Sequence, residues 1–211
     1  MSGDLTAVET RLWQQGARRV AGVDEAGRGP IAGPVVAAAV VWRPGVAAGP
    51  VRDSKALSER QRDTAFAYVH EHALAWAVAM VGVEDVDRMN PLRAALHAMA
   101  LAVQRLRLPV DRILVDGNMT LPLRTADQQA IVKGDARSVS IAAASIMAKV
   151  TRDRWMRRCD ELFPGYGFAE HKGYGSATHI RMLRELGPCP IHRRSFAPVA
   201  GLKQGRLALD D

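Results

Sequence analysis

Two apolar runs separated by a short segment rich in glycine and proline constrain the fold of this chain most strongly. The runs cover residues 19–25 and 35–42, and the segment between them reads AGRGPIAGP. Apolar runs of this length, bounded by turn residues, are typical of buried strands. The pattern therefore predicts two central strands joined by a tight loop, and the first strand ends on two acids, Asp24 and Glu25.

Strands and helices alternate along the rest of the chain. Ser58 and Gln61 form a capping box that predicts a helix to about His72, and residues 74–80 alternate as a third strand. Asn90 and Pro91 then predict the start of a helix that runs up to Pro109. We expect its buried stripe to consist of Leu92, Leu96, Met99, Val103 and Leu106.

Two short strands and a long helix follow. The strands are expected at residues 113–116 and around 131–133, and the helix at about 138–162. Beyond it we expect a glycine-rich loop, one helix capped by Ser176, and a tail rich in proline and arginine. This order predicts an α/β fold, a mixed sheet flanked by helices with a helical C-terminal lobe.

Composition places the chain among globular proteins. It has 211 residues, of which 48% are hydrophobic and 24% charged, so we expect one large domain with a proper core. Asp4 and Glu9 fall where a secretory signal would need apolar residues, and no run is long enough to span a membrane. We therefore expect a cytoplasmic protein.

The chain contains two cysteines, Cys159 and Cys189, and neither lies in a CxxC motif. They cannot build a disulfide framework, which favours reduced thiols. His171, His179 and His192 lack the ligand spacing of a zinc site with either cysteine. We expect these histidines to serve packing or phosphate contacts.

Positive charge is concentrated in the last third of the chain. The formal net charge is +7, and residues 133–211, with 14 basic and 8 acidic residues, supply +6 of it. Such an excess favours a polyanionic partner, although solvated helix faces are the plain alternative. The change in charge falls near residues 133–138, where we place the boundary between the core and the lobe.

Four acids lie where expected strands meet loops. Asp24 and Glu25 end the first strand, Asp116 ends the strand before Gly117, and Asp135 follows Gly134. Carboxylates without a Cys/His ligand set suggest a site for a hard cation, Mg²⁺ or Mn²⁺. Neighbouring residues on a regular strand point to opposite faces. Either the strand bulges at Glu25, or Glu25 contributes through its backbone carbonyl or by holding a second ion.

These residues belong to a series of motifs that resembles the ribonuclease HII family from about residue 19 to residue 199. The motifs are VDEAGRGP at 23–30, AGPVV at 32–36, DSK at 53–55, VDGN at 115–118, KGD at 133–135, IAAASI at 141–146, AKVTRD at 148–153 and HKGYG at 171–175. Ser176 follows where threonine is frequent in the family. The related ribonuclease HIII carries an additional N-terminal domain, for which 18 residues leave no room.

The resemblance implies an RNase H-like fold that cleaves the RNA strand of RNA–DNA hybrids and cuts on the 5′ side of single ribonucleotides embedded in duplex DNA. By position, Asp24, Glu25, Asp116 and Asp135 match the acidic catalytic and metal-binding set. It also implies that the loop Gly27, Arg28 and Gly29 senses the ribose 2′-hydroxyl, with Tyr174 beside the neighbouring deoxyribose. We expect a monomer divided into a leader (1–18), a catalytic core (19–137) and a basic helical region that completes the substrate cleft (138–211).

Elementary chemistry supports these assignments. Two metal ions held by carboxylates can activate water and stabilise the departing oxygen of a phosphodiester. Glycines let the backbone approach a sugar closely, and a 2′-hydroxyl both donates and accepts hydrogen bonds. Further candidates for phosphate or sugar contacts, each with solvated charge as the alternative, are Lys55, Asn118, Lys149 and Lys172.

Three other functions compete with this interpretation. A dinucleotide-binding enzyme would need a helix after the glycine loop, where this chain has an expected strand. A nucleic-acid-binding module without catalysis would explain the basic region but would place four acids beside phosphates. A junction-resolving nuclease would use the same carboxylate chemistry and usually needs a dimer.

Overall fold

A five-stranded mixed sheet forms the centre of the computed structural model, which describes residues 4–207. Its strand order is β3-β2-β1-β4-β5. The three N-terminal strands pair antiparallel, and β4 and β5 continue the sheet in parallel beyond β1. The strands are β1 (Val20–Ala26), β2 (Val35–Val41), β3 (Ala75–Val81), β4 (Arg112–Asp116) and β5 (Asp127–Ile131).

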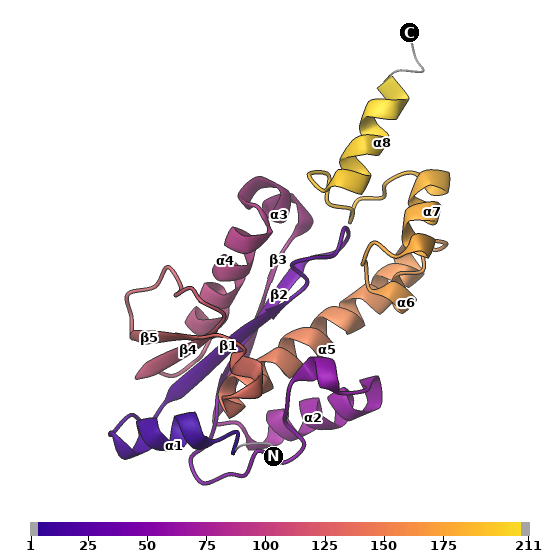
Figure 1. Cartoon of the computed structure of the whole chain (residues 1–211). Helices are drawn as coiled ribbons and strands as arrows, with labels where there is room; N and C mark the ends of the chain where they lie inside the picture. Colours follow the sequence, from indigo (N-terminus) through magenta and orange to yellow (C-terminus); the bar gives the residue numbers. More distant parts are fainter. Residues whose placement is uncertain (1–3, 208–211) are drawn as a thin grey trace.

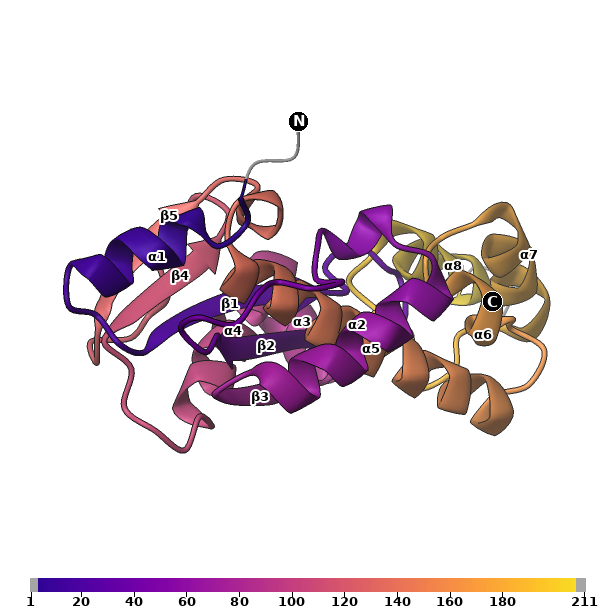
Figure 2. The same cartoon turned by 90° about the horizontal axis from the view of Figure 1, so that it is seen from below.

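Helices cover both faces of the sheet, as Figures 1 and 2 show. On one face α3 (Val83–Met89) and α4 (Pro91–Gln104) pack in a core with Val23, Ala37 and Val115. On the other face α5 (Val139–Leu162) and α2 (Glu59–His72) pack over Ala38 and Val40. The alternating residues of β1 and β2 thus face two separate cores, and this explains why both runs are apolar throughout.

A helix from the expected leader lies against the sheet. Leu12 of α1 (Ala7–Gln14) packs with Leu114 and Ile141, and Glu9 is fully buried. The Glu9 carboxylate accepts hydrogen bonds from the Ser138 hydroxyl and from the Ser140 amide, 3.0 Å away. An acid at this position is favourable because the first amides of a helix lack partners within the helix.

The helical C-terminal lobe is built on the far half of α5. It comprises α6 (Phe168–His171), α7 (Ala177–Leu186) and α8 (Ala197–Leu207), which lie beyond one end of the sheet in Figure 1. Its core includes Met156, Cys159, Phe168 and Cys189, and both cysteines are free and buried. Since α5 packs on the sheet and also joins the lobe, the division at residues 137 and 138 stays a prediction about function.

Most expected elements are confirmed, with three differences. The strand expected around 131–133 lies at Asp127–Ile131, while Val132 is 59% exposed and Lys133 is left-handed at φ 55°. The expected stripe of α4 is wrong at Leu92, which is 43% exposed, because alanines form much of the buried face of this helix. The helices α1, α3, α6 and α8 were not predicted. Within residues 4–207, no helix is long and apolar enough to cross a membrane.

Candidate active site

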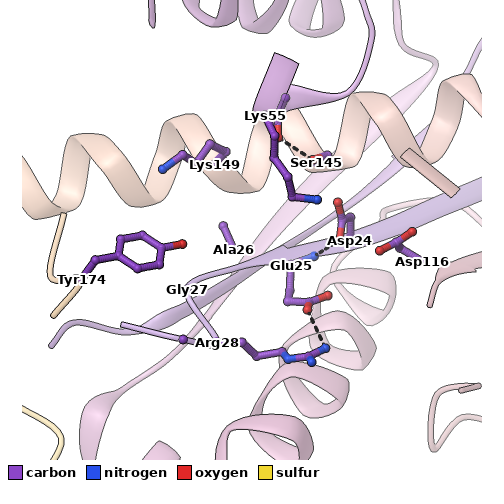
Figure 3. A pocket seen from close by; sticks show the side chains of 12 residues that line it. Asp24, Glu25, Ala26, Gly27, Arg28, Lys55, Asp116, Ser145, Lys149 and Tyr174 are labelled. Carbon is purple, nitrogen blue, oxygen red and sulfur yellow. Dashed lines mark hydrogen bonds and ion pairs between the residues drawn. The ribbon is translucent and has the colours of Figure 1, made fainter. Parts of the chain in front are cut away.

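The register of the parallel strands brings three acids together. Val23 of β1 pairs with Val115 of β4. Asp24 and Asp116 are the next residues on these two strands, so they lie side by side at the same end of the sheet. Figure 3 shows Asp24, Asp116 and Glu25 close together at this end. Acids that end two different strands in the sequence therefore lie in one cluster in the structure.

Asp24 points to the face covered by α5. On the same face a Cβ at Gly22 would lie 2.2 Å from the backbone nitrogen of Ile141, so the absence of a side chain lets α5 approach β1. This close approach brings Ser145 of α5 next to the site, where it lines the same cavity as Asp24. The Ser145 and Ser54 hydroxyls lie 2.7 Å apart, which links α5 to the Asp53-Ser54-Lys55 loop.

Glu25 points away from Asp24, because β1 stays regular. The antiparallel pairing with β2 continues without interruption to the pair of Ala26 and Val36, so the bulge offered as one alternative is wrong. The Glu25 carboxylate accepts a hydrogen bond of 3.2 Å from Arg28, and its amide donates to the Asp24 carboxylate at 2.7 Å. The manner in which Glu25 would contribute to a metal site stays a prediction.

Asp135 lies beyond Asp116 in the short 3-10 helix Gly134–Ala136. The Gly134 amide donates to the Asp116 carboxylate at 2.7 Å, which fixes the loop to the end of β4. Asp135 is nearly buried, and its carboxylate accepts from the Lys55 ammonium at 3.0 Å. Lys55 thus stands between Asp135 and the other acids.

The acids carry negative charge that the protein only partly compensates. Burial, together with the charges of Glu25 and Asp116, raises the pKa of Asp24 well above its ordinary value. Burial also raises the pKa of Glu25, against the opposing charge of Arg28, and the pKa of Asp116, against the hydrogen bond from Gly134. Such a cluster is suited to a divalent cation, which removes this penalty.

The side chains as they stand do not form a complete ligand cage. Within the described part of the chain, no three His, Cys, Asp or Glu side chains converge as a ready-made metal group. The position of Lys55 explains this for Asp135, because its ammonium already satisfies that carboxylate. Burial lowers the pKa of Lys55, but the hydrogen bond to Asp135 and the nearby carboxylates outweigh this and raise it.

A cavity of about 300 Å³ joins the acids to the glycine loop. Its lining includes most of the predicted residues: Asp24, Glu25, Gly27, Arg28, Gly29, Lys55, Asp116, Lys149 and Tyr174. Tyr174 is 48% exposed and faces the cavity across from Arg28 in Figure 3. Three predicted residues do not line it: Asp135, Asn118, which is exposed after β4, and Lys172, whose ammonium donates to the Ala169 carbonyl.

Two groups of contacts were not predicted from the sequence. Ser54 and Ser145 line the cavity, and the sequence signals for them were the motifs DSK and IAAASI, which did not indicate this contact. Arg152 and Arg193 are buried and donate to backbone carbonyls around the glycine loop. Arg152 lies in the motif AKVTRD and Arg193 in the tail rich in proline and arginine, and neither pattern indicates these contacts. Arg154 and Arg157 pair with Asp63 and Glu59.

The three histidines of the lobe, of which His179 and His192 are buried, serve packing. His171 and His179 stack with ring centroids 4.2 Å apart, and the Nε2 atoms of His179 and His192 lie 3.0 Å apart. Burial lowers the pKa of His179 and of His192 to about 4, so both rings are neutral at physiological pH.

Comparison with known proteins gives one consistent result. A family model described as Ribonuclease HII matches residues 21–199. Ribonuclease HII of Geobacter metallireducens is 53% identical over 195 residues, which cover 92% of this chain and 91% of that protein. Ribonuclease HII of Geobacter sulfurreducens is 54% identical over 191 residues, which cover 90% of this chain and 88% of that protein.

Solved structures agree with these sequences. The ribonuclease H2 of Pyrococcus horikoshii OT3 has a TM-score of 0.73 and 28% identity, and the match covers 89% of this chain and 98% of that one. The RNase HII of Archaeoglobus fulgidus, solved in a complex with PCNA, has a TM-score of 0.71 and 28% identity, with 88% and 97% covered.

Proposed function

Because the chain belongs to the ribonuclease HII family and is therefore a metal-dependent endoribonuclease, we propose that it hydrolyses the RNA strand of RNA–DNA hybrids and cuts on the 5′ side of single ribonucleotides embedded in duplex DNA. One observation carries the proposal. Three carboxylates line the same cavity as a glycine loop that can approach a sugar and an exposed tyrosine. Chemistry on a phosphate and recognition of a sugar can therefore occur side by side.

The acids would hold two divalent cations, Mg²⁺ or Mn²⁺. Asp24 would be the shared ligand, with Glu25, Asp116 and Asp135 around it, and Lys55 would have to release Asp135 for that residue to take part. When bound, the cations supply positive charge that activates the attacking water and stabilises the departing oxygen. The uncompensated charge of the carboxylates supports this assignment, since it favours cation binding over an empty cluster.

The reaction is an in-line displacement at phosphorus. Water attacks the phosphodiester on the 5′ side of the ribonucleotide, and the bond from phosphorus to the 3′ oxygen of the preceding nucleotide breaks. The products are a 3′-hydroxyl on the preceding nucleotide and a 5′-phosphate on the ribonucleotide. Lys149, held by Asp153 at 2.8 Å, and Lys55 lie at the cavity, where their charge would hold the substrate phosphates.

Sugar recognition would come from both parts of the chain. The loop 27–29 belongs to the region 19–137, whereas Tyr174 and Lys149 belong to the basic region 138–211. Their common cavity supports the prediction that the C-terminal region completes the substrate cleft. The loop would contact the 2′-hydroxyl, and Tyr174 would lie against the following deoxyribose.

The test uses a labelled duplex that contains one ribonucleotide, a continuous RNA–DNA hybrid, and an all-DNA duplex of the same sequence. We expect cleavage of the first two with Mg²⁺ or Mn²⁺, none with a chelator, and none of the all-DNA duplex. Products that end in a 3′-hydroxyl before the ribonucleotide support the proposed position of the cut. Binding without cleavage would indicate a non-catalytic module, and cleavage of a four-way DNA junction a resolving nuclease.

A further inference from the structure

Two arginines are buried beneath the glycine loop without an acidic partner. Arg193 is 0% exposed and Arg152 is 1% exposed. Among the described residues, neither forms an ion pair. A buried guanidinium needs compensation, because loss of its hydration is costly. Here backbone carbonyls provide that compensation.

Arg193 holds the glycine loop through three carbonyls. Its Nη2 donates to the Gly27 carbonyl at 2.5 Å, its Nη1 to the Arg28 carbonyl at 2.9 Å, and its Nε to the Gly33 carbonyl at 2.9 Å. The planar guanidinium fixes the directions of these three bonds relative to one another. The peptide groups of Gly27 and Arg28 therefore have a defined orientation, with their oxygens turned into the protein.

This orientation determines where the next two amides point. In a trans peptide the N–H points opposite to the C=O of the same plane, so the amides of Arg28 and Gly29 face away from Arg193. Neither amide donates a hydrogen bond to another of the residues 4–207. Arg28 and Gly29 are exposed and line the cavity. The loop thus presents two unpaired donors to the substrate side.

Arg152 supports the loop from its other end. It donates to the carbonyls of Ala32 at 3.1 Å and Pro34 at 3.0 Å, and to that of Lys172 at 2.9 Å, two residues before Tyr174. A Cβ at Gly27 would lie 2.1 Å from Arg152 Nε, and the φ of Gly27 is +97°. Glycine is therefore required at position 27 by Arg152 itself, before any substrate binds.

The segment that carries Arg193 is anchored both to Ile31 and to α3. The Arg193 amide donates to the Ile31 carbonyl at 2.8 Å. Asp87 of α3 accepts from the amides of Arg194 at 2.7 Å and Ser195 at 3.0 Å. Arg193 thus contacts the loop from a fixed position, on the side of the loop that faces away from the cavity.

We propose that Arg193 is a positioning residue for sugar recognition, which orients the loop so that the amides of Arg28 and Gly29 face the ribonucleotide. The inference rests on the proposed function and goes beyond it, since it assigns part of the discrimination between ribose and deoxyribose to a side chain that does not line the cavity. The acids would bind metal and hydrolyse phosphodiesters without this residue, but with poorer selection of the sugar.

The test measures selectivity in binding. In an Asp116→Asn background, which prevents cleavage, fluorescence anisotropy gives the affinities for a duplex with one ribonucleotide and for the all-DNA duplex. We expect Arg193→Lys and Arg193→Gln to lower the ratio of the two affinities at least 10-fold, or to near one if it starts lower, with the all-DNA affinity changed less than 2-fold. Lysine keeps the charge but not the three fixed bonds, so it should not restore the ratio.

Val103→Ala serves as a matched control for lost stability, because Val103 is a buried residue of α4, which packs on the face of the sheet opposite α5. It should lower the melting temperature and leave the ratio unchanged. Asp87→Ala, which releases the anchored segment without removing Arg193, should lower the ratio less than the Arg193 variants do. If the Arg193 variants fail to fold, an unchanged ratio in Asp87→Ala contradicts the inference.

The outcomes separate the inference from the function. If the parent protein does not distinguish the two duplexes, the proposed function fails. If the parent distinguishes them and the folded Arg193 variants keep the ratio, or weaken both affinities equally, Arg193 is only a structural residue.

Discussion

Burial and two neighbouring acids make the charge of Asp24 costly for the fold, and its replacement should separate stability from activity. We expect Asp24→Asn to reduce cleavage by orders of magnitude, because it removes a shared metal ligand. The pKa of Asp24 is raised in the folded state, so its penalty is absent at low pH and grows as pH rises from its ordinary value through the folded pKa. With chelator present, the variant should melt at or above the wild-type temperature.

Thermal denaturation at pH 5 and pH 8 measures this effect. The advantage of Asp24→Asn over wild type should be larger at pH 8, and added Mn²⁺ should raise the melting temperature of wild type more than that of the variant. Nearly full activity in the variant would contradict the metal site. A lower melting temperature with chelator at both pH values would contradict the electrostatic penalty.

We expect glycine at position 29 to be required for activity on the substrate and not for folding. A Cβ at Gly29 would meet only Tyr174 Cε1, at 3.9 Å, which is ordinary contact. We therefore expect Gly29→Ala to keep the wild-type melting temperature while losing activity on both the hybrid and the single ribonucleotide. Gly27→Ala is the contrast, because its Cβ would clash with Arg152 and destabilise the protein.

Tyr174 should matter more for one substrate than for the other. A ring against the following sugar leaves no room for an added 2′-hydroxyl, so it favours a junction from RNA to DNA. Tyr174→Ala should lose much of its activity on a single embedded ribonucleotide and less on a continuous hybrid. Equal losses on both substrates in parallel kinetic assays, with a lower melting temperature, would make Tyr174 a packing residue.

The site residues that the sequence predicts lie in local patterns, whereas the contacts that it misses join residues far apart in the chain. The acids, the glycine loop and Tyr174 lie in local patterns, and most of them line the cavity. Ser145 and Arg193 contact partners 91 and 166 residues away, so no local pattern reveals these contacts. Asp135 was predicted as a ligand, but its contact with Lys55 depends on a loop 80 residues earlier in the chain.

Helices and strands were predicted correctly where a strong local sequence signal agrees with the tertiary packing. Ser176 caps α7 as expected, and the capping box of α2 is present. β5 is polar, with residues DQQAI, because it is an edge strand whose Gln128 bonds to the backbone of Leu121 and Leu123. β5 belongs to the sheet because it pairs with β4. Its own sequence lacks the pattern of apolar residues from which a strand is predicted.

A histidine pair ties α7 to the loop of Tyr174 and should make the lobe sensitive to acid. The Cys189 amide donates to His192 Nδ1 at 3.0 Å, so the His192 proton lies on Nε2 and points to His179. His179 can then donate from Nδ1 to the Tyr174 carbonyl at 2.8 Å. The chain of bonds is complete only when both rings are neutral.

The direction of the pH effect follows from the lowered pKa values. Burial lowers the pKa of both histidines to about 4, below the unfolded value of 6.5, so their contribution to stability is present above pH 6.5 and is lost as pH falls toward 4. The loss should be on the order of 3 kcal/mol for each histidine, since one pKa unit corresponds to about 1.4 kcal/mol. His192→Gln should be less stable at pH 7 and show a flatter decline, measured by urea denaturation from pH 7 to pH 4.5. An equally steep decline would assign the acid sensitivity to other groups.

The whole molecule presents less free positive charge than its composition implies. Residues 133–211 supply +6 of the formal net charge, but two of their arginines are buried against carbonyls. Two others, Arg154 and Arg157, pair with acids of α2. The charge asymmetry therefore serves the packing of α5 and the glycine loop as well as any nucleic acid, and a count of residues overstates the electrostatic attraction of the lobe.

Salt dependence of duplex binding tests how much of this charge reaches the substrate. Each phosphate neutralised by the protein contributes a slope of about −0.9 in a plot of log affinity against log salt. We expect Lys149→Ala, which removes an ammonium from the cavity, to weaken binding and to reduce the slope by at most about one unit, because Asp153 already pairs with this lysine.

Arg112→Ala is the matched control, since Arg112 also pairs with an aspartate but begins β4, at the opposite end of that strand from Asp116. It should leave the slope unchanged in anisotropy titrations from 50 to 300 mM salt, concentrations chosen to span roughly the range over which phosphate contacts weaken. A slope that neither variant alters would show that Lys149 contacts no phosphate, and an equal change in both would assign the attraction to the field of the whole molecule.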